Sequence, residues 1–328
     1  MAGENRRVKD DVSTGLRVKG GPLARATKDD ASSESALGER VTVNKAYKMY
    51  VGGAFIRSES GRYFQVQPSA NAIGDADPGT VNVPRGSRKD VRDAVLAAKN
   101  AEHGWSGRTA YNRGQILYRL AEVLESRQGE LAASLVRAGA TADEAVREVI
   151  QTVDRCVYYA GFADKISSLL ASHNPVAGPH FGFSIPDAMG VVSIIAPETP
   201  ALLGLVSVVL PVIVSGNTCV VLASEKDPRT AVVLTECLAT SDLPGGVVNV
   251  LTGHPSELAS HMASHREVNA VSAWLASPEL RAKVEELSAD SVKRTKTHAP
   301  RESWDDAQGL GWIEPFLETK TVWHPMGV

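Results

Sequence analysis

Cysteine is scarce in this chain: its 328 residues include only Cys156, Cys219 and Cys237. Three thiols cannot build a disulfide scaffold, and no C-x-x-C pair indicates a zinc or redox motif. No uninterrupted apolar segment reaches the roughly 20 residues that a membrane-spanning helix needs, since the longest one, 201–215, is interrupted by Pro211. These absences argue against a disulfide-rich secreted fold and a helical membrane span. We expect a cytoplasmic protein.

A strong charge of either sign is also missing. The net charge is −3 and the isoelectric point is near 6.3, so no basic field indicates a nucleic-acid partner. The first residues carry charges throughout and lack the apolar segment of a secretory signal. Hydrophobic residues make up 43% of the chain and charged residues 22%, which is typical of a globular protein with a sizeable core.

Aromatic side chains are absent from residues 1–45, where charges of both signs are mixed with small residues. Such a segment buries too little apolar area to offset the entropy of ordering it. We predict a flexible N-terminal arm, with a partner-binding arm as the alternative.

The residues that follow predict a small β-sheet and then helices. Segments 47–51 and 54–56 flank Gly52-Gly53, the pattern of a β-hairpin, and 63–67 alternates as a further strand. We expect these strands to form a small sheet beside the main fold. Apolar residues recur at helical spacing in 91–101, 116–124 and 142–163.

From Gly190 onward, short apolar strands alternate with helices. Strands are predicted at 191–195, 219–222, 247–251 and 268–273, and helices at 202–215, 228–239 and 255–263. Strands that are apolar on both faces and separated by helices indicate a parallel sheet covered on both sides. The fold class is therefore α/β, a Rossmann-like doubly wound sheet with ligands beyond the carboxyl ends of its strands.

The central segment resembles the cofactor-binding half of the aldehyde dehydrogenase superfamily. The matching pieces are Gly-Val-Val-Ser-Ile-Ile-Ala-Pro at 190–197, Ser-Gly-Asn-Thr-Cys-Val-Val at 215–221, Ser224-Glu225, and Leu-Pro-Gly-Gly-Val-Val-Asn-Val-Leu-Thr-Gly at 243–253. The hairpin at 50–55 is similar to the family's opening strands. The resemblance covers roughly 47–290 and implies that 46–276 is an aldehyde-dehydrogenase-like cofactor-binding domain, with NAD(P) as the cofactor of such a domain.

The C-terminal segment shows a second similarity. Phe-Leu-Glu-Thr-Lys-Thr-Val-Trp at 316–323 resembles the family's C-terminal strand, which belongs to its oligomerisation sheet. Between the two matches lie roughly 30 residues, where the family carries a whole catalytic domain. We therefore predict that 277–328 is a remnant helix, a linker and an oligomerisation strand. The chain is similar to the shortened second unit of two-unit aldehyde dehydrogenases.

The family's catalytic groups have no counterparts in this sequence. No cysteine follows Cys237, and the segment expected to supply the general base reads Thr-Lys-Thr-His-Ala-Pro at 295–300. Thr199 stands where the family's P-W-N-F-P motif has its oxyanion asparagine. Each of the three cysteines is interpreted as inert, so the resemblance assigns no catalytic residue.

The dinucleotide motifs are altered as well. The resemblance leaves three candidate cofactor-binding residues, Thr199, Ser224 and Glu225. The alternative interpretation of Glu225 is a solvated carboxylate on a loop. Leu222 replaces the lysine of the family's K-P-S-E run, and Trp274-Leu275 stands within its F-T-G-S motif. Because glycine allows close approach of backbone to phosphate, and Trp274 could fill the pocket, we expect weak NAD(P) binding or none.

These observations favour a non-catalytic structural or regulatory subunit. We expect it to assemble with an active aldehyde dehydrogenase, or with itself, through the strand from Thr319 to Trp323. The alternatives are an NAD(P)-dependent oxidoreductase acting on aldehydes and a dinucleotide sensor without chemistry. His261 and His265 are four residues apart, as helical metal ligands are, but no third ligand is evident. No metal, nucleic-acid or membrane partner is expected.

Overall fold

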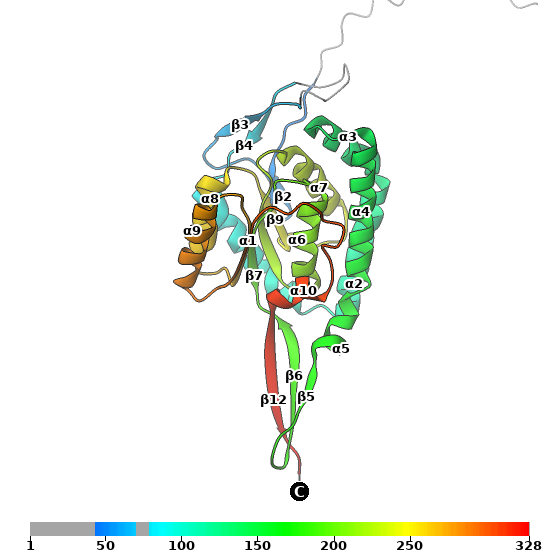
Figure 1. Cartoon of the computed structure of the whole chain (residues 1–328), viewed down its shortest axis with the longest axis vertical. Helices are drawn as coiled ribbons and strands as arrows, with labels where there is room; N and C mark the ends of the chain where they lie inside the picture. The colour runs from blue at the N-terminus through cyan, green and yellow to red at the C-terminus, as the bar shows by residue number, and fades with distance from the viewer. Residues whose placement is uncertain (1–42, 70–78, 328) are drawn as a thin grey trace, which may run out of the picture. The chain divides into compact units, whose positions relative to one another are not determined.

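A computed structural model describes residues 43–69 and 79–327 (Figure 1). The predicted flexible arm therefore lies almost entirely outside the described residues. None of the helices within those two ranges combines the length and the apolar character that crossing a membrane requires.

A seven-stranded sheet, in the order β11-β10-β7-β8-β9-β1-β2, forms the centre of the fold. Its parallel part consists of β7 (Val191–Ile195), β8 (Thr218–Leu222), β9 (Val248–Leu251), β10 (Ala270–Trp274) and β11 (Arg294–His298). Every residue of β7, β8, β9 and β10 is buried. The α/β prediction of a doubly wound parallel sheet is confirmed, and its four apolar strands lie within two residues of their predicted bounds.

Two layers of helices cover the sheet (Figure 1). The strand side chains alternate between them: Val191 and Ile195 pack with one layer, and Val192 and Ile194 with the other. The first layer contains α1 (Arg88–Ser106), α8 (Pro255–Ser264) and α9 (Pro278–Ala289). The second contains α2 (Ala110–Ser126), α3 (Gln128–Ala138), α4 (Ala142–Ala160), α6 (Leu203–Val214) and α7 (Pro228–Thr240).

The N-terminal hairpin belongs to the main sheet, so the prediction that its strands form a separate small sheet was wrong for this part. Strands β1 (Met49–Val51) and β2 (Ala54–Ile56) pair with each other, and β1 pairs antiparallel with β9. The Asn249 side chain accepts a 2.8 Å hydrogen bond from the Gly52 N–H, which attaches the turn to β9. Strands β3 (Tyr63–Val66) and β4 (Val81–Pro84) do form a separate two-stranded sheet.

Strand β11 was missed, because its residues 294–298 are polar and were interpreted as part of a polar stretch. It lies at the edge of the sheet and, among the described residues, pairs with β10 alone, so its side chains are only partly covered. The domain boundary predicted between 276 and 277 stays a prediction. Beyond it, α9 and β11 continue the alternation of helix and strand in the main sheet.

A three-stranded antiparallel sheet completes the fold. It consists of β5 (Ser172–Asn174), β6 (His180–Ala188) and β12 (Leu317–Pro325), in the order β12-β6-β5. Short elements lead into it: η3 (Ala163–Lys165) and α5 (Ile166–Leu170) before β5, and α10 (Leu310–Ile313) and η4 (Glu314–Phe316) before β12. All nine residues of β12 pair with β6, and the two strands lie side by side in Figure 1.

Candidate functional site

The predicted site residues gather where the parallel strands end. The loops after β7 and β8 are neighbours, because the Ala196 N–H donates a 2.9 Å hydrogen bond to the Leu222 carbonyl. Thr199 and Glu225 are exposed at this edge, whereas Ser224 is buried. The structure therefore brings the first loop, which carries Thr199, against the second, which carries Ser224 and Glu225.

Glu198 joins the two loops, and sequence reasoning did not select it. Its carboxylate accepts hydrogen bonds from the Ser224 hydroxyl at 2.8 Å, the Lys226 N–H at 3.0 Å and the Glu225 N–H at 3.3 Å. The Ser224 hydroxyl also bridges to the Glu198 carbonyl at 3.1 Å. The Glu198 carboxylate therefore accepts hydrogen bonds from the donors at the start of the loop that leads into α7. Its place in the short loop that follows an apolar strand is the signal that could have found it.

Glu225 meets the loop after β9, and this contact was also missed. One of its carboxylate oxygens lies 2.7 Å from Nδ1 of His254. The His254 ring lies against the Phe64 ring, with 4.9 Å between the ring centroids. The Glu225 side chain remains 44% exposed, so it is a surface carboxylate with one defined partner.

Bulky side chains are buried where β10 ends. Leu275 belongs to the core on the α8 and α9 side, and Trp274 packs on the opposite side of the sheet. The Trp274 ring stacks on the His298 ring at a centroid distance of 4.2 Å and an interplanar angle of 16°. At the position of the family's F-T-G-S motif, side chains therefore pack in place of an open glycine turn.

All three cysteines are buried and unpaired. Burial raises the pKa of Cys156 and Cys219 far above that of a free thiol, and raises the pKa of Cys237 to about 11. The thiolate, not the thiol, is the nucleophile, and a raised pKa keeps these groups as thiols. None of them has the partly exposed surroundings of a reactive cysteine.

The histidine pair lies at the end of α8. His261 is in the helix and His265 is the residue that ends it, and both line the same surface hollow. Within the described ranges, no group of three or more His, Cys, Asp or Glu side chains is placed to hold a metal ion.

Known proteins resemble this chain in sequence and fold. Residues 66–299 match the Aldehyde dehydrogenase family. Alpha-ketoglutaric semialdehyde dehydrogenase from Bacillus subtilis is 30% identical over 232 residues, which are 70% of this chain and 46% of that protein. The chain therefore spans about half the length of the curated relatives it matches.

Solved structures give the same match. PnpE from Pseudomonas sp. WBC-3 superposes with a TM-score of 0.72 at 26% identity, covering 78% of this chain and 51% of that one. Betaine aldehyde dehydrogenase from Staphylococcus aureus, solved in complex with NAD+, superposes with a TM-score of 0.71 at 23% identity over 77% of this chain and 50% of that one. With a family match over more than half of its residues, this chain belongs to the aldehyde dehydrogenase family.

Proposed function

We propose that this chain is a non-catalytic, structural or regulatory subunit that docks on an active aldehyde dehydrogenase, or on a second copy of itself, through β12. The observation that carries the proposal is that β12 is an edge strand. It pairs with β6 along one side, and no strand among the described residues pairs with its other side. An edge with free N–H and C=O groups is a template for a strand from another chain.

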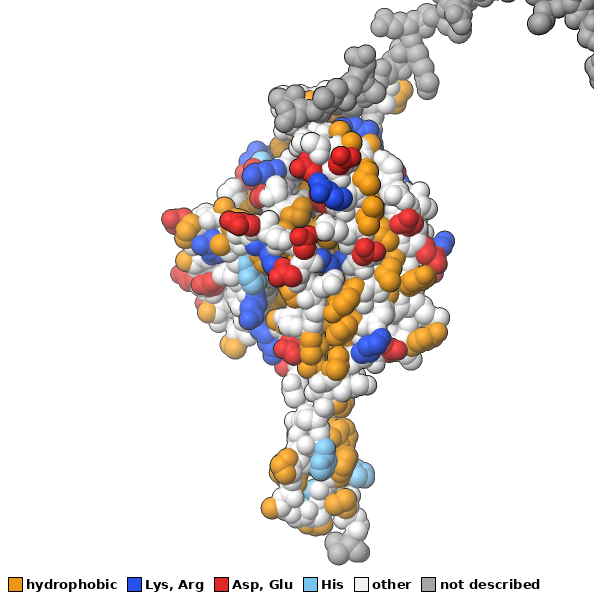
Figure 2. All heavy atoms as spheres, turned by 45° about the vertical axis from the view of Figure 1, so that its right-hand side comes forward, with side chains coloured by type: hydrophobic (Ala, Val, Ile, Leu, Met, Phe, Trp, Pro, Cys, Tyr) orange, Lys and Arg blue, Asp and Glu red, His pale blue; other side chains and the backbone are white. Residues whose placement is uncertain are grey.

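The surface beside this edge supports docking. The sheet exposes four large apolar side chains, with Phe181, Ile185 and Val322 on one face and Trp323 on the other. Trp323 is 63% exposed, which is unusual for a tryptophan without a partner surface. Figure 2 shows hydrophobic and histidine side chains side by side over this part of the molecule. Apolar groups beside a free strand edge are typical of surfaces that bind protein.

The absence of a suitable nucleophile supports a role without catalysis. Oxidation of an aldehyde through a thioester needs an activated thiolate. This chain has three thiols, and each is buried with a raised pKa. His298 stands in the segment where the resemblance expects the general-base glutamate, and its ring is stacked on Trp274.

The residues at the carboxyl edge do not fit a dinucleotide, and we infer that NAD(P) is not a resident cofactor. The Glu198 carboxylate already occupies two backbone N–H groups and the Ser224 hydroxyl, so a phosphate brought to them would meet a negative charge. Leu222, at the position of the family's lysine, is fully buried in the core and offers no cation. Leu275 is 5% exposed and replaces the glycine of the phosphate-side motif.

Co-expression tests the docking proposal. A tagged active aldehyde dehydrogenase from the same cells is expressed with this chain, and the complex is isolated by affinity and sized by light scattering. We expect co-purification, and we expect Trp323→Asp to abolish it because a charge on the docking strand stays unpaired in the complex. Val292→Asp is the matched control: Val292 is 92% exposed with φ of 53°, a conformation that aspartate tolerates better than valine.

The outcomes are distinct. A wild-type chain that stays monomeric alone and never co-purifies with an active relative would overturn the docking proposal. Steady NADH formation from short aldehydes by the pure chain, lost on replacing Cys237 or Cys219 by alanine, would favour the oxidoreductase instead.

A further inference from the structure

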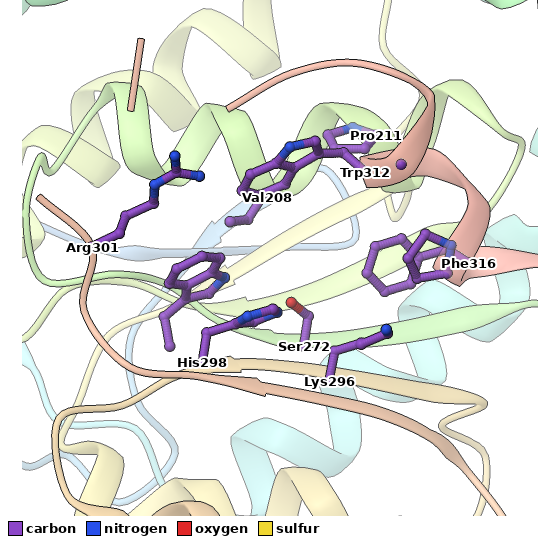
Figure 3. Close-up of a pocket in the computed structure, with 11 residues that line it drawn as sticks. Val208, Pro211, Ser272, Lys296, His298, Arg301, Trp312 and Phe316 are labelled. Atoms are coloured by element: carbon purple, nitrogen blue, oxygen red, sulfur yellow. The ribbon is translucent and has the colours of Figure 1, made fainter. Parts of the chain in front are cut away.

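A cavity of about 240 Å³ lies on the α6 side of the sheet, and none of Thr199, Ser224 and Glu225 lines it. Strands β10 and β11 contribute Ser272, Lys296 and His298, and Trp312 of α10 lies across from them (Figure 3). Nothing in the proposed docking function uses this cavity. Pockets for drug-sized ligands measure about 300–1,000 Å³, so this cavity accommodates a smaller molecule and not a dinucleotide.

Flat aromatic rings form its walls. The ring planes of Trp274 and Trp312 are within 5° of parallel, with their centroids 6.0 Å apart. His298 stacks on the Trp274 ring at 4.2 Å, and Phe316 lines the same cavity. Surfaces of this kind favour planar ligands, because aromatic rings gain energy from stacked and edge-to-face contacts beyond simple burial.

An unpaired donor is buried in this wall. The Nε1 N–H of Trp274 has no hydrogen-bond partner among the described residues, and Trp274 is only 7% exposed. Burying a donor without a partner costs about 1–3 kcal/mol, so such groups are rare in folded proteins. The residue that carries this N–H is one of those that line the cavity.

The charge at the cavity is positive. Lys296 and Arg301 both line it, and no lining residue is acidic. Lys296 has no ion-pair partner within the described ranges, whereas Arg301 pairs with Asp306 at 2.6 Å. The Arg301 guanidinium lies 5.6 Å from the centre of the Trp312 ring, in the range of a cation–π contact. An anion entering the cavity would find one unpaired cation and no opposing carboxylate.

We propose that this cavity binds a small planar aromatic carboxylate. The ring would lie against the tryptophan walls, and the carboxylate would accept hydrogen bonds from the Lys296 ammonium and from the Trp274 indole. Shape, the unpaired donor and the charge each select one property of such a ligand: flatness, an acceptor atom and a negative charge. The proposal does not depend on whether the chain docks on a relative.

Three probes of similar size separate these properties. Benzoate is planar and charged, benzamide is planar and uncharged, and cyclohexanecarboxylate is charged but not planar. Indole N–H resonances of the ¹⁵N-labelled chain report binding, with the Trp274 signal assigned from Trp274→Phe. We expect benzoate to shift the Trp274 signal saturably. The Trp105 signal is the internal reference, because its N–H is already bonded to the Ile213 carbonyl at 2.9 Å.

The two control probes should bind about tenfold more weakly, since each lacks one selected property. Lys296→Met should weaken benzoate about tenfold by removing a charge-assisted bond. Lys283→Met is the matched control, because Lys283 is an exposed α9 lysine outside the cavity whose ion pair is with Glu286, and it should leave benzoate affinity unchanged. Lysine-to-methionine changes at exposed positions keep the fold, which melting curves verify.

The proposal fails if benzoate causes no saturable shift of the Trp274 signal at millimolar concentrations. It also fails if benzamide and benzoate bind equally, or if Lys296→Met binds benzoate as the wild type does. Shifts of Trp105 and Trp274 together would mean a general effect of the added salt, and would count equally against a specific site.

Discussion

The side-chain amide of Asn217 donates a 2.7 Å hydrogen bond to the backbone carbonyl of Phe316, ninety-nine residues away. Its carbonyl oxygen accepts bonds of 2.8 Å from the Met189 and Gly190 N–H groups, and the side chain is fully buried. One residue, just before β8, therefore holds both the junction between β6 and β7 and the start of β12. The asparagine of the Gly-Asn-Thr motif is a structural link between the main sheet and the proposed docking strand.

Asn217→Ala should lower the free energy of unfolding by about 2–4 kcal/mol, because three backbone groups in or near the core lose a hydrogen bond. Urea unfolding followed by circular dichroism measures this change. Asn112→Ala is the control, since the Asn112 side chain has hydrogen bonds with Arg108 and Gln115, both close in sequence, and its effect should stay within about 0.5 kcal/mol. An unchanged urea midpoint for Asn217→Ala would show that the hydrogen bonds of Asn217 do not contribute to the free energy of unfolding.

The same variant should loosen β12. Hydrogen exchange of amides in 317–325 should be faster in Asn217→Ala than in the wild type, and by a larger factor than in β8, whose exchange the lower global stability alone would speed. If exchange in β12 stayed as slow as before, pairing with β6 alone would be holding the strand.

Dinucleotide binding should be weak or absent. The Glu198 carboxylate already binds the donors of the loop after β8, and Leu275 replaces the glycine of the phosphate-side motif, so titration calorimetry with millimolar NAD+ or NADP+ should give no saturable heat. A full-length active relative serves as the positive control. Micromolar affinity for either dinucleotide would contradict the inference that NAD(P) is not a resident cofactor.

The parallel sheet could be predicted because β7 to β10 are apolar on both faces, a pattern that local sequence carries by itself. The hairpin was assigned correctly as a hairpin, but its pairing with β9 depends on Asn249 meeting the Gly52 N–H, a contact nearly two hundred residues apart in sequence. No local pattern encodes such a partner.

The candidate site was only partly predictable for the same reason. Thr199, Ser224 and Glu225 were found through family motifs, but Glu198 and His254 acquire their partners only when the loops of neighbouring strands meet. Strand β11 was missed because an edge strand needs little apolar character. The tryptophan-lined cavity joins residues from α6, from two strands and from the segment after those strands, which no spacing rule relates.

Thiol reagents should report the burial of the cysteines. With a pKa of about 11, Cys237 is thiolate in roughly one molecule in ten thousand at pH 7, and Cys156 and Cys219 even less. Native protein should therefore react with a disulfide reagent only at the rate of global or local unfolding, and all three thiols should react in urea. If the native protein were labelled rapidly and the Cys237→Ala variant were not, Cys237 would be a reactive thiol. That result would weaken the proposal of a non-catalytic role.

The protonation of His298 provides a test of the charge around the cavity. Burial lowers the pKa of His298 below its ordinary 6.5, and the nearby Lys296 and Arg301 lower that pKa further. Because the folded protein disfavours the imidazolium, this histidine's contribution to stability is fully present above about pH 6.5 and is lost as the pH falls below it. Lys296→Met should raise the pKa of His298 by removing a positive neighbour, and Lys283→Met should not. Proton NMR of the His298 ring measures both. A wild-type pKa at or above 6.5 would show that the cations do not act on this ring, and would remove the electrostatic reason for an anion to enter the cavity.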